Sequence, residues 1–206
     1  MMRIRRIGWS GLVCLFVCLS GALAPAQAQG KGISDASASA LMNDTWYAMP
    51  AQYTRRSSEV IVVDKTKKQE VVVPLEKGKE VIHAAYRSGK AHYCGMLEEY
   101  EANFKTLLSR EHASGRWTKQ QFLYIEMLHN YTMQFSLGKI RIKLGEDGKK
   151  DFEVIEKGPL WTKPCTDDDR KIISSQILAF IKANAAPLPA APATQRAEPT
   201  PTSQKK

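Results

Sequence analysis

Apolar residues recur every three or four positions through the middle of the chain, the spacing that places them on one face of a helix. This stripe begins after Pro74 and comprises Val81, Ala85, Gly89, Tyr93, Met96, Tyr100, Phe104 and Leu107. Gly95 interrupts it, because glycine weakens a helix interior. The pattern therefore predicts one helix that ends near Cys94 and a second from about Leu97 to His112.

Capping signals mark the ends of two further helices. Thr118 and Gln121 have the spacing of a capping box, and Gly138 occupies the position of a C-terminal cap. The segment between them is apolar on nearly every face, which predicts a central, buried helix. A last helix is expected after Thr166, because the three aspartates at 167–169 favour the positive end of a helix dipole.

Segments rich in β-branched residues predict two short β-hairpins. The first pairs 59–63 with 70–73 across a lysine-rich turn, and the second pairs 139–144 with 151–155 across an Asp-Gly turn. An earlier apolar segment, 38–53, is a candidate helix whose end is left open by a proline. Together these elements predict an α+β fold that is predominantly helical, a small helical bundle with two short β-hairpins.

The first 28 residues have the organisation of an export signal. Arg3, Arg5 and Arg6 precede an apolar run over 7–24, and Ala-Gln-Ala at 26–28 matches a signal-peptidase site. No later stretch approaches the roughly 18 continuous apolar residues that suggest a membrane span. We therefore expect a signal peptide over 1–28, no membrane span in the mature protein, and a location in the periplasm or outside the cell.

Composition divides the rest of the chain into three parts. Residues 29–40 are rich in Gly, Ser and Ala and are expected to form a flexible lead-in. Residues 184–206 are rich in Pro and Ala and have too few large apolar side chains to form a core, so we expect a disordered tail. Residues 41–183 then remain as a single folded domain.

Cys94 and Cys165 are the cysteines that remain once the leader, with Cys14 and Cys18, is removed. Two cysteines in an oxidising compartment most simply pair, so we expect one structural disulfide. Closing a loop of about 70 residues would stabilise the fold by about 4 kcal/mol in the chain-entropy account. The sequence leaves open whether the bond forms within one chain or between two.

Basic residues outnumber acidic ones. The mature chain would keep 27 Lys and Arg against 21 Asp and Glu, a net charge of +6. This excess favours an envelope protein or an acidic polymer as partner, although solubility alone would account for it equally well. The candidate contact residues lie in a lysine-rich loop and in a basic stretch that contains a tryptophan. They are Lys65, Lys67, Lys68, Arg110, Arg116, Trp117 and Lys119.

Trp117 also has a structural interpretation. It directly precedes the Thr118 cap, where an apolar side chain often packs against the helix that it introduces. A core role therefore competes with a binding role at this position. Nucleic acid is not expected as a ligand, because the chain carries an export signal and no nucleic-acid-binding module is recognisable in it.

Glu126 and His129 form a Glu-x-x-His pair on one face of the predicted central helix, as in carboxylate-bridged metal bundles. The pair occurs once and falls short of even a four-ligand zinc site, which favours His129 as a core histidine hydrogen-bonded to Glu126 or to a backbone carbonyl. The stretch 83–101 holds two more histidines beside Cys94, but a cysteine in a disulfide has no thiolate for ligation. We expect no metal and no other cofactor.

Recognisable catalytic patterns are missing: the sequence has no nucleophile elbow, no Ser-x-x-Lys and no phosphate-binding loop. With the basic loops and the spacer-like tail, this favours an exported, non-enzymatic binding or accessory protein of the bacterial cell envelope. Two alternatives stay open. One is a periplasmic chaperone or stress protein that opens to expose its apolar helices, and the other is a metal-binding periplasmic protein that uses Glu126 and His129.

Overall fold

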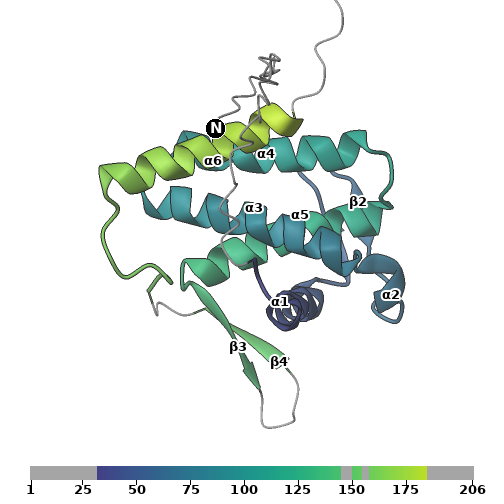
Figure 1. Ribbon diagram of the computed structural model, residues 1–206. Coiled ribbons are helices and arrows are strands. Elements are labelled where there is room, and N and C mark those ends of the chain that lie inside the picture. The colour runs from purple at the N-terminus through teal and green to yellow at the C-terminus, as the bar shows by residue number, and fades with distance from the viewer. Residues whose placement is uncertain (1–31, 145–149, 155–157, 185–206) are drawn as a thin grey trace, which may run out of the picture. The chain divides into compact units, whose positions relative to one another are not determined.

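A computed structural model of the chain describes residues 32–144, 150–154 and 158–184 (Figure 1). Within these residues lie the helices α1 (Asp35–Ala48), α2 (Lys68–Val71), α3 (Leu75–Tyr93), α4 (Leu97–Ala113), α5 (Lys119–Ser136) and α6 (Asp167–Asn184). The strands are β1 (Gln52–Thr54), β2 (Val60–Val62), β3 (Ile140–Leu144) and β4 (Lys150–Val154). The predicted predominance of helix is confirmed.

Helix ends fall where the capping chemistry predicts them. Gly95 takes a positive φ of 73° between α3 and α4, a conformation that suits glycine and breaks the long apolar stripe into two helices. The Thr118 hydroxyl accepts a hydrogen bond from the Gln121 amide and the Gln121 side chain accepts one from the Thr118 amide, which completes the capping box of α5. The Thr166 hydroxyl likewise accepts from the Asp169 amide at the start of α6.

α3 lies at the centre of the described part of the chain, in contact with α1, α4, α5 and α6. Figure 1 shows α4 and α6 running together on one side of α3 and α5, with α1 crossing on the other side. Nine of the 18 residues of α5 are buried, which confirms the prediction that this helix is largely internal. Its Tyr124 is fully buried and donates its hydroxyl to the Met42 carbonyl at 2.7 Å, so the core also ties α5 to α1.

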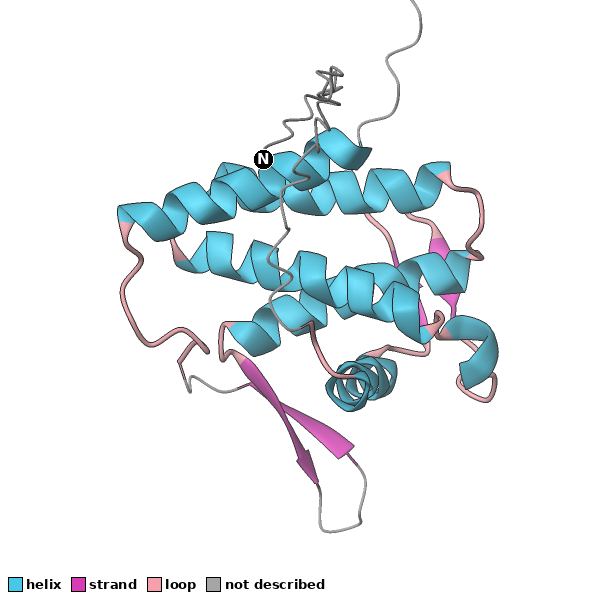
Figure 2. Ribbon diagram, viewed as in Figure 1, coloured by secondary structure: helices cyan, strands magenta, loops and turns pink. Residues whose placement is uncertain are grey.

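The first predicted hairpin is wrong in its second strand. β2 pairs in antiparallel register with β1, so that Tyr53 lies opposite Ile61, and the segment predicted as its partner, 70–73, forms part of α2 and the extended link to α3 (Figure 2). The β-branched residues of this segment have another role, because Val71 and Val73 are buried in the main core. Apolar β-branched side chains fit any well-packed interior, and here burial outweighs strand preference.

The second predicted hairpin is confirmed. β3 and β4 pair antiparallel, with Ile140 opposite Val154 and Leu144 opposite Lys150 (Figure 2). The part of the chain that the structure describes therefore holds two separate two-stranded sheets beside its helices.

Cys94 and Cys165 form the predicted disulfide within one chain, with their Cα atoms 5.4 Å apart. The bond belongs to a small apolar cluster of its own, in which Ala91 and Cys94 pack against Ile173 and Ile177 of α6. The far end of α6 is held differently. There the Phe180 ring lies 4.8 Å from the Arg87 guanidinium and 5.5 Å from that of Arg110.

The expected flexible lead-in, 29–40, is wrong for its second half. α1 begins at Asp35 after Ser34, whose side chain accepts a hydrogen bond from the Ser37 amide, and Ala38 is fully buried. A run of small polar residues looked unstructured, but serine is also a strong helix N-cap and alanine the best helix former. The predicted signal peptide and the tail after Asn184 lie outside the described residues.

Replacing Gly138 with alanine should destabilise the fold by about 3 kcal/mol. Gly138 ends α5 with a φ of 67°, and a Cβ there would meet the Gly158 carbonyl oxygen. The left-handed conformation alone costs a side chain about 1 to 2 kcal/mol, and the collision adds to it. Gly115→Ala is the matched control, because its φ of 61° is similar and a Cβ there meets nothing. Equal losses in urea unfolding for the two variants would contradict the contact.

Candidate functional site

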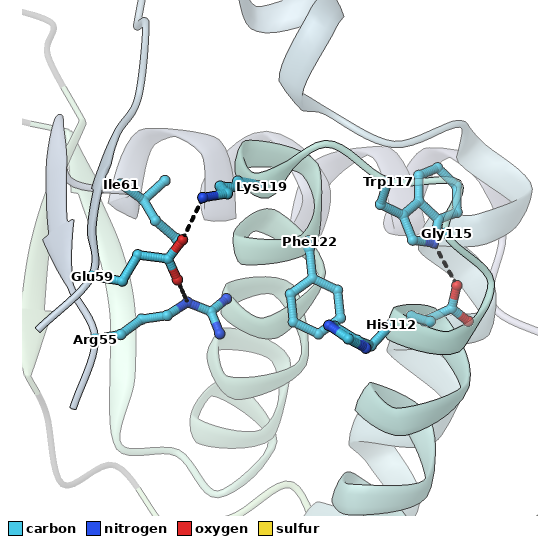
Figure 3. A pocket seen from close by; sticks show the side chains of 9 residues that line it. Arg55, Glu59, Ile61, His112, Gly115, Trp117, Lys119 and Phe122 are labelled. Atoms are coloured by element: carbon cyan, nitrogen blue, oxygen red, sulfur yellow. Dashed lines mark hydrogen bonds and ion pairs between the residues drawn. The ribbon is translucent and has the colours of Figure 1, made fainter. Parts of the chain in front are cut away.

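A pocket of about 300 Å³ lies between the β1–β2 hairpin and the corner where α4 leads into α5 (Figure 3). The hairpin contributes Arg55, Glu59 and Ile61, and the last turn of α4 contributes Glu111 and His112. The connecting loop and the first turns of α5 complete the wall with Gly115, Trp117, Lys119 and Phe122. In Figure 3 the charged side chains of Arg55, Glu59 and Lys119 lie together on one side of the pocket, and the aromatic side chains of Phe122 and Trp117 lie on the other.

Glu59 joins the two cations of the hairpin side. Its carboxylate lies 2.8 Å from Lys119 Nζ and 3.8 Å from Arg55 Nε (Figure 3). The hydrogen bond and charge of Lys119, with the charge of Arg55, lower the pKa of the Glu59 carboxyl. Arg55 also reaches Glu126 at 3.5 Å, which ties the hairpin to the middle of α5.

Glu111 orients Trp117. The carboxylate of Glu111 is 1% exposed and accepts the indole N–H of Trp117 at 2.7 Å. Burial alone would raise the pKa of Glu111, but hydrogen bonds from Trp117, Lys77 and Arg110 and the charge of Arg110 together keep it below its usual value. The indole is thus held by an ionised, well-partnered carboxylate. Trp117 also packs against the main core, which agrees with its structural interpretation, and it lines the pocket, while its binding role stays a prediction.

Two arginines lie over the aromatic rings of this region. The Arg116 guanidinium is 5.5 Å from the Trp117 ring, and that of Arg55 is 5.4 Å from the Phe122 ring. His112 meets Phe122 edge-on, with ring centroids 5.8 Å apart. These contacts hold planar cations beside apolar faces, an arrangement that can receive a ligand carrying both a carboxylate and an apolar group.

Lys67 lines a second pocket, of about 190 Å³, together with Asp64 and Glu70, and its Nζ lies 3.6 Å from the Glu70 carboxylate. Thr118 and Gln120 from the start of α5 line the same pocket. The first turn of α5 carries no acidic residue, so its positive dipole end adds to the lysine charge. We name the surface formed by Lys67, Arg116, Trp117 and Lys119 the basic corner.

The other three predicted contact residues are engaged elsewhere. Lys65 donates to the carbonyl oxygens of Trp46 and Met49 at 2.5 and 2.8 Å, which caps the C-terminal end of α1, and partial burial lowers its pKa. Lys68 donates to Asn43 at 2.6 Å. Arg110 belongs to the ion-pair network around Glu111, with Nη1 also donating to Asn184 at 3.1 Å. These three side chains all make contacts within the fold.

Glu126 and His129 have different partners. Glu126 faces Arg55, while His129 is fully buried, places Nε2 2.9 Å from the Ser88 hydroxyl and stacks on Phe104 at 4.5 Å. Burial lowers the pKa of His129 to about 4, with the Arg87 charge acting in the same direction. Among the described residues, no group of three or more His, Cys, Asp or Glu is placed to hold a metal ion. His129 therefore behaves as a core histidine.

His129 and Ser88 form a buried serine–histidine pair that no sequence motif predicted. Ser88 also accepts a hydrogen bond from Asn103 at 2.8 Å. All three side chains are completely buried, and none of them lines the pockets around the basic corner. A nucleophile needs access to its substrate, so this arrangement serves as a packed polar network.

Sequence analysis predicted two lining residues of the main pocket, Trp117 and Lys119, together with their neighbour Arg116, because the three lie in one short stretch. It missed Arg55, Glu59, His112 and Phe122, which come from separate segments that only the folded chain brings together. Comparison of the chain with protein-family models, with curated proteins and with solved structures finds no match. No helix in the described ranges is long and apolar enough to cross a membrane.

Proposed function

We propose that this chain is an exported, non-enzymatic binding or accessory protein of the bacterial cell envelope, which contacts a protein or an acidic polymer through the basic corner. The observation that carries the proposal is that Trp117 and Lys119 line a pocket with aromatic walls, while the Arg116 guanidinium lies beside them, 5.5 Å from the Trp117 ring. Export rests on the leader-like first 28 residues. The pairing of an oriented tryptophan with exposed cations is typical of contact surfaces.

Rigidity supports a binding role for this corner. Trp117 is oriented by Glu111, and Lys119 is steered by Glu59, so little side-chain freedom is lost when a partner binds. The cations are accessible as well, since the side chain of Lys119 is 79% exposed. Carboxylates of a partner would compete with Glu59 for Lys119 and Arg55, and an apolar group beside them would enter between Trp117 and Phe122.

Replacing Lys67, Arg116 and Lys119 together with alanine should weaken binding to poly-L-glutamate by about tenfold, because each exposed ion pair contributes on the order of 0.5 kcal/mol. The control changes three other exposed lysines, Lys105, Lys139 and Lys171, which line neither pocket of the corner, and it alters the net charge equally. Affinity chromatography at several salt concentrations measures both. Equal weakening in the two triple variants would mean that net charge, and not the corner, governs binding.

A protein partner is tested in intact cells with a photo-crosslinking amino acid at position 116 and, as the control, at position 105. One partner of fixed stoichiometry captured at 116 and absent at 105 supports an accessory role. A captured partner that persists in the Lys67, Arg116 and Lys119 triple variant would show that the contact lies elsewhere. If the partner is a polymer, no protein adduct forms at position 116, and the Lys67, Arg116 and Lys119 triple variant still binds poly-L-glutamate more weakly.

A periplasmic chaperone or stress protein is the second candidate, and the buried His129 favours it. A histidine that is fully buried and neutral must take up a proton when the chain opens in acid, so acid would favour exposure of the apolar faces of α3 and α5. The disulfide would keep α6 attached during such opening. The stability of the native protein and of His129→Gln as a function of pH tests this behaviour. Nothing in the arrangement of Glu126 and His129 adds support to the metal-binding alternative.

A further inference from the structure

A third pocket, of about 290 Å³, lies directly against the disulfide. Its wall is formed by the two aromatic residues Tyr93 and Trp161, whose ring centroids are 5.7 Å apart, and by the segment that leads into α6. Cys165 is part of this wall. None of the residues that line this pocket belongs to the basic corner. Neither the binding proposal nor the chaperone alternative uses the pocket.

The two sulfur-bearing residues differ in accessibility. Cys94 is 4% exposed and packs inside the small cluster beneath α6, whereas Cys165 is half-buried and lines the pocket. A thiolate can attack a disulfide only along a line that reaches one of its sulfurs. The pocket opens such a path to Cys165, and packing closes the path to Cys94.

The geometry points to Cys165 as a site of thiol–disulfide exchange, with the pocket beside it as the docking place for an incoming thiolate. In this step the thiolate forms a bond to Cys165 Sγ, the bond between Cys165 and Cys94 breaks, and Cys94 leaves as a thiolate that takes a proton from water. A second thiol of the reductant then releases Cys165 and becomes oxidised with the first. Low-molecular-weight thiols and protein dithiols supply the same attacking group.

Charges around the pocket suit an anionic nucleophile. Lys90 and Lys163 line it, and its one carboxylate, Asp169, lies 3.0 Å from Lys90 and accepts hydrogen bonds from Thr166. Asp169 is thereby compensated, which leaves Lys163 to attract the thiolate. The charge on the leaving sulfur of Cys94 is also stabilised. Cys94 lies at the C-terminal end of α3, where the helix dipole disfavours a thiolate. The positive charge of Arg170, which donates to the Cys94 carbonyl at 2.6 Å, offsets this effect of the dipole.

Exchange at Cys165 would loosen α6. The cluster that seats the beginning of this helix has four buried residues, Ala91, Cys94, Ile173 and Ile177, and the disulfide is its covalent part. Once the bond is open, the Lys90–Asp169 ion pair and the Arg170 hydrogen bond are the described polar contacts that still join this end of α6 to α3. The redox state of one bond would then set how firmly the C-terminal helix is held.

The test exposes the folded, full-length protein to glutathione at pH 8 and stops the reaction early with acid. Free thiols are then alkylated and both cysteines are mapped by mass spectrometry. We expect glutathione on Cys165 and the alkyl group on Cys94, in at least about tenfold excess over the reverse pattern. Equal labelling of the two cysteines, or no reaction until urea is added, would overturn the assignment. Protein unfolded in urea is the reference in which both sulfurs react.

Two further comparisons test whether the charged wall of the pocket, and not only the exposure of Cys165, speeds the reaction. Lys163→Glu should slow the reaction with glutathione about threefold or more, while Lys171→Glu, which makes the same charge change on the outer face of α6, should leave it unchanged. Equal slowing in both would remove the role of the pocket. Reduced thioredoxin replaces glutathione in a parallel arm. Faster exchange with the dithiol identifies a protein as the better reductant, and faster exchange with glutathione identifies a small thiol.

Discussion

Replacing Cys94 and Cys165 together with alanine is expected to lower the free energy of unfolding by about 4 kcal/mol. The two cysteines are 71 positions apart, and cutting the crosslink returns the entropy of that loop to the unfolded chain. For a domain of this length the loss corresponds to a decrease in Tm of about 10 °C. Urea unfolding of the oxidised protein and of the double variant, followed by circular dichroism, measures the difference.

The oxidised protein treated with a strong reductant is the matched control for this experiment, because it loses the same crosslink without any change of side chains. It should unfold close to the double variant. If both unfold at the same urea concentration as the oxidised protein, the disulfide does not contribute to stability. Intact mass under non-reducing conditions should also show a monomer that is lighter by two hydrogens than the reduced chain.

Acid should destabilise the protein through His129. Its folded pKa is about 4, below the usual 6.5, so the folded state binds its proton more weakly than the unfolded state. Above pH 6.5 the histidine is neutral in both states and its contribution is complete. As the pH falls from 6.5 to 4 only the unfolded state takes up the proton, and the free energy of unfolding decreases by about 3 kcal/mol.

His129→Gln isolates this contribution, because glutamine keeps a hydrogen-bonding group near Ser88 but does not titrate. The variant should lose about 3 kcal/mol less than the native protein between pH 7 and pH 4, even though other groups, including His83 and His92, titrate in both. Parallel stability curves for the two proteins would contradict the assignment. Binding of a hydrophobic dye at pH 4 by the native protein, with its disulfide intact and less in the variant, would support the chaperone alternative.

Local chemistry made most of the helices predictable. Thr118, Thr166, Gly95 and Gly138 act on the backbone within a few residues of themselves, so their effect can be read without knowing the rest of the fold. The same holds for the disulfide, which needed only a count of cysteines and a compartment. Ser34 carries an equally local capping signal, but the small residues around it resemble a linker.

Features that depend on distant parts of the chain were not predictable. The partner strand of β2, Gln52–Thr54, lacks the apolar β-branched residues that usually indicate a strand. The segment 71–73 is made of valines, but two of them are there to fill the core and not to form a strand. Lys65 looks like any loop lysine until the fold brings it to the end of α1. The candidate site divides in the same way, since Trp117 and its neighbours are adjacent in sequence whereas Arg55 arrives from the hairpin.

The Phe180 ring, held between Arg87 and Arg110, gives α6 a second attachment whose chemistry differs from that of the disulfide. A helix joined at both ends stays at a high effective concentration relative to its docking surface when either end lets go. Amide hydrogen exchange in α6 should therefore proceed through brief one-ended openings that close again, without unfolding of the main core. Loss of either attachment turns the helix into a hinged flap, and the end that remains determines the direction in which it swings.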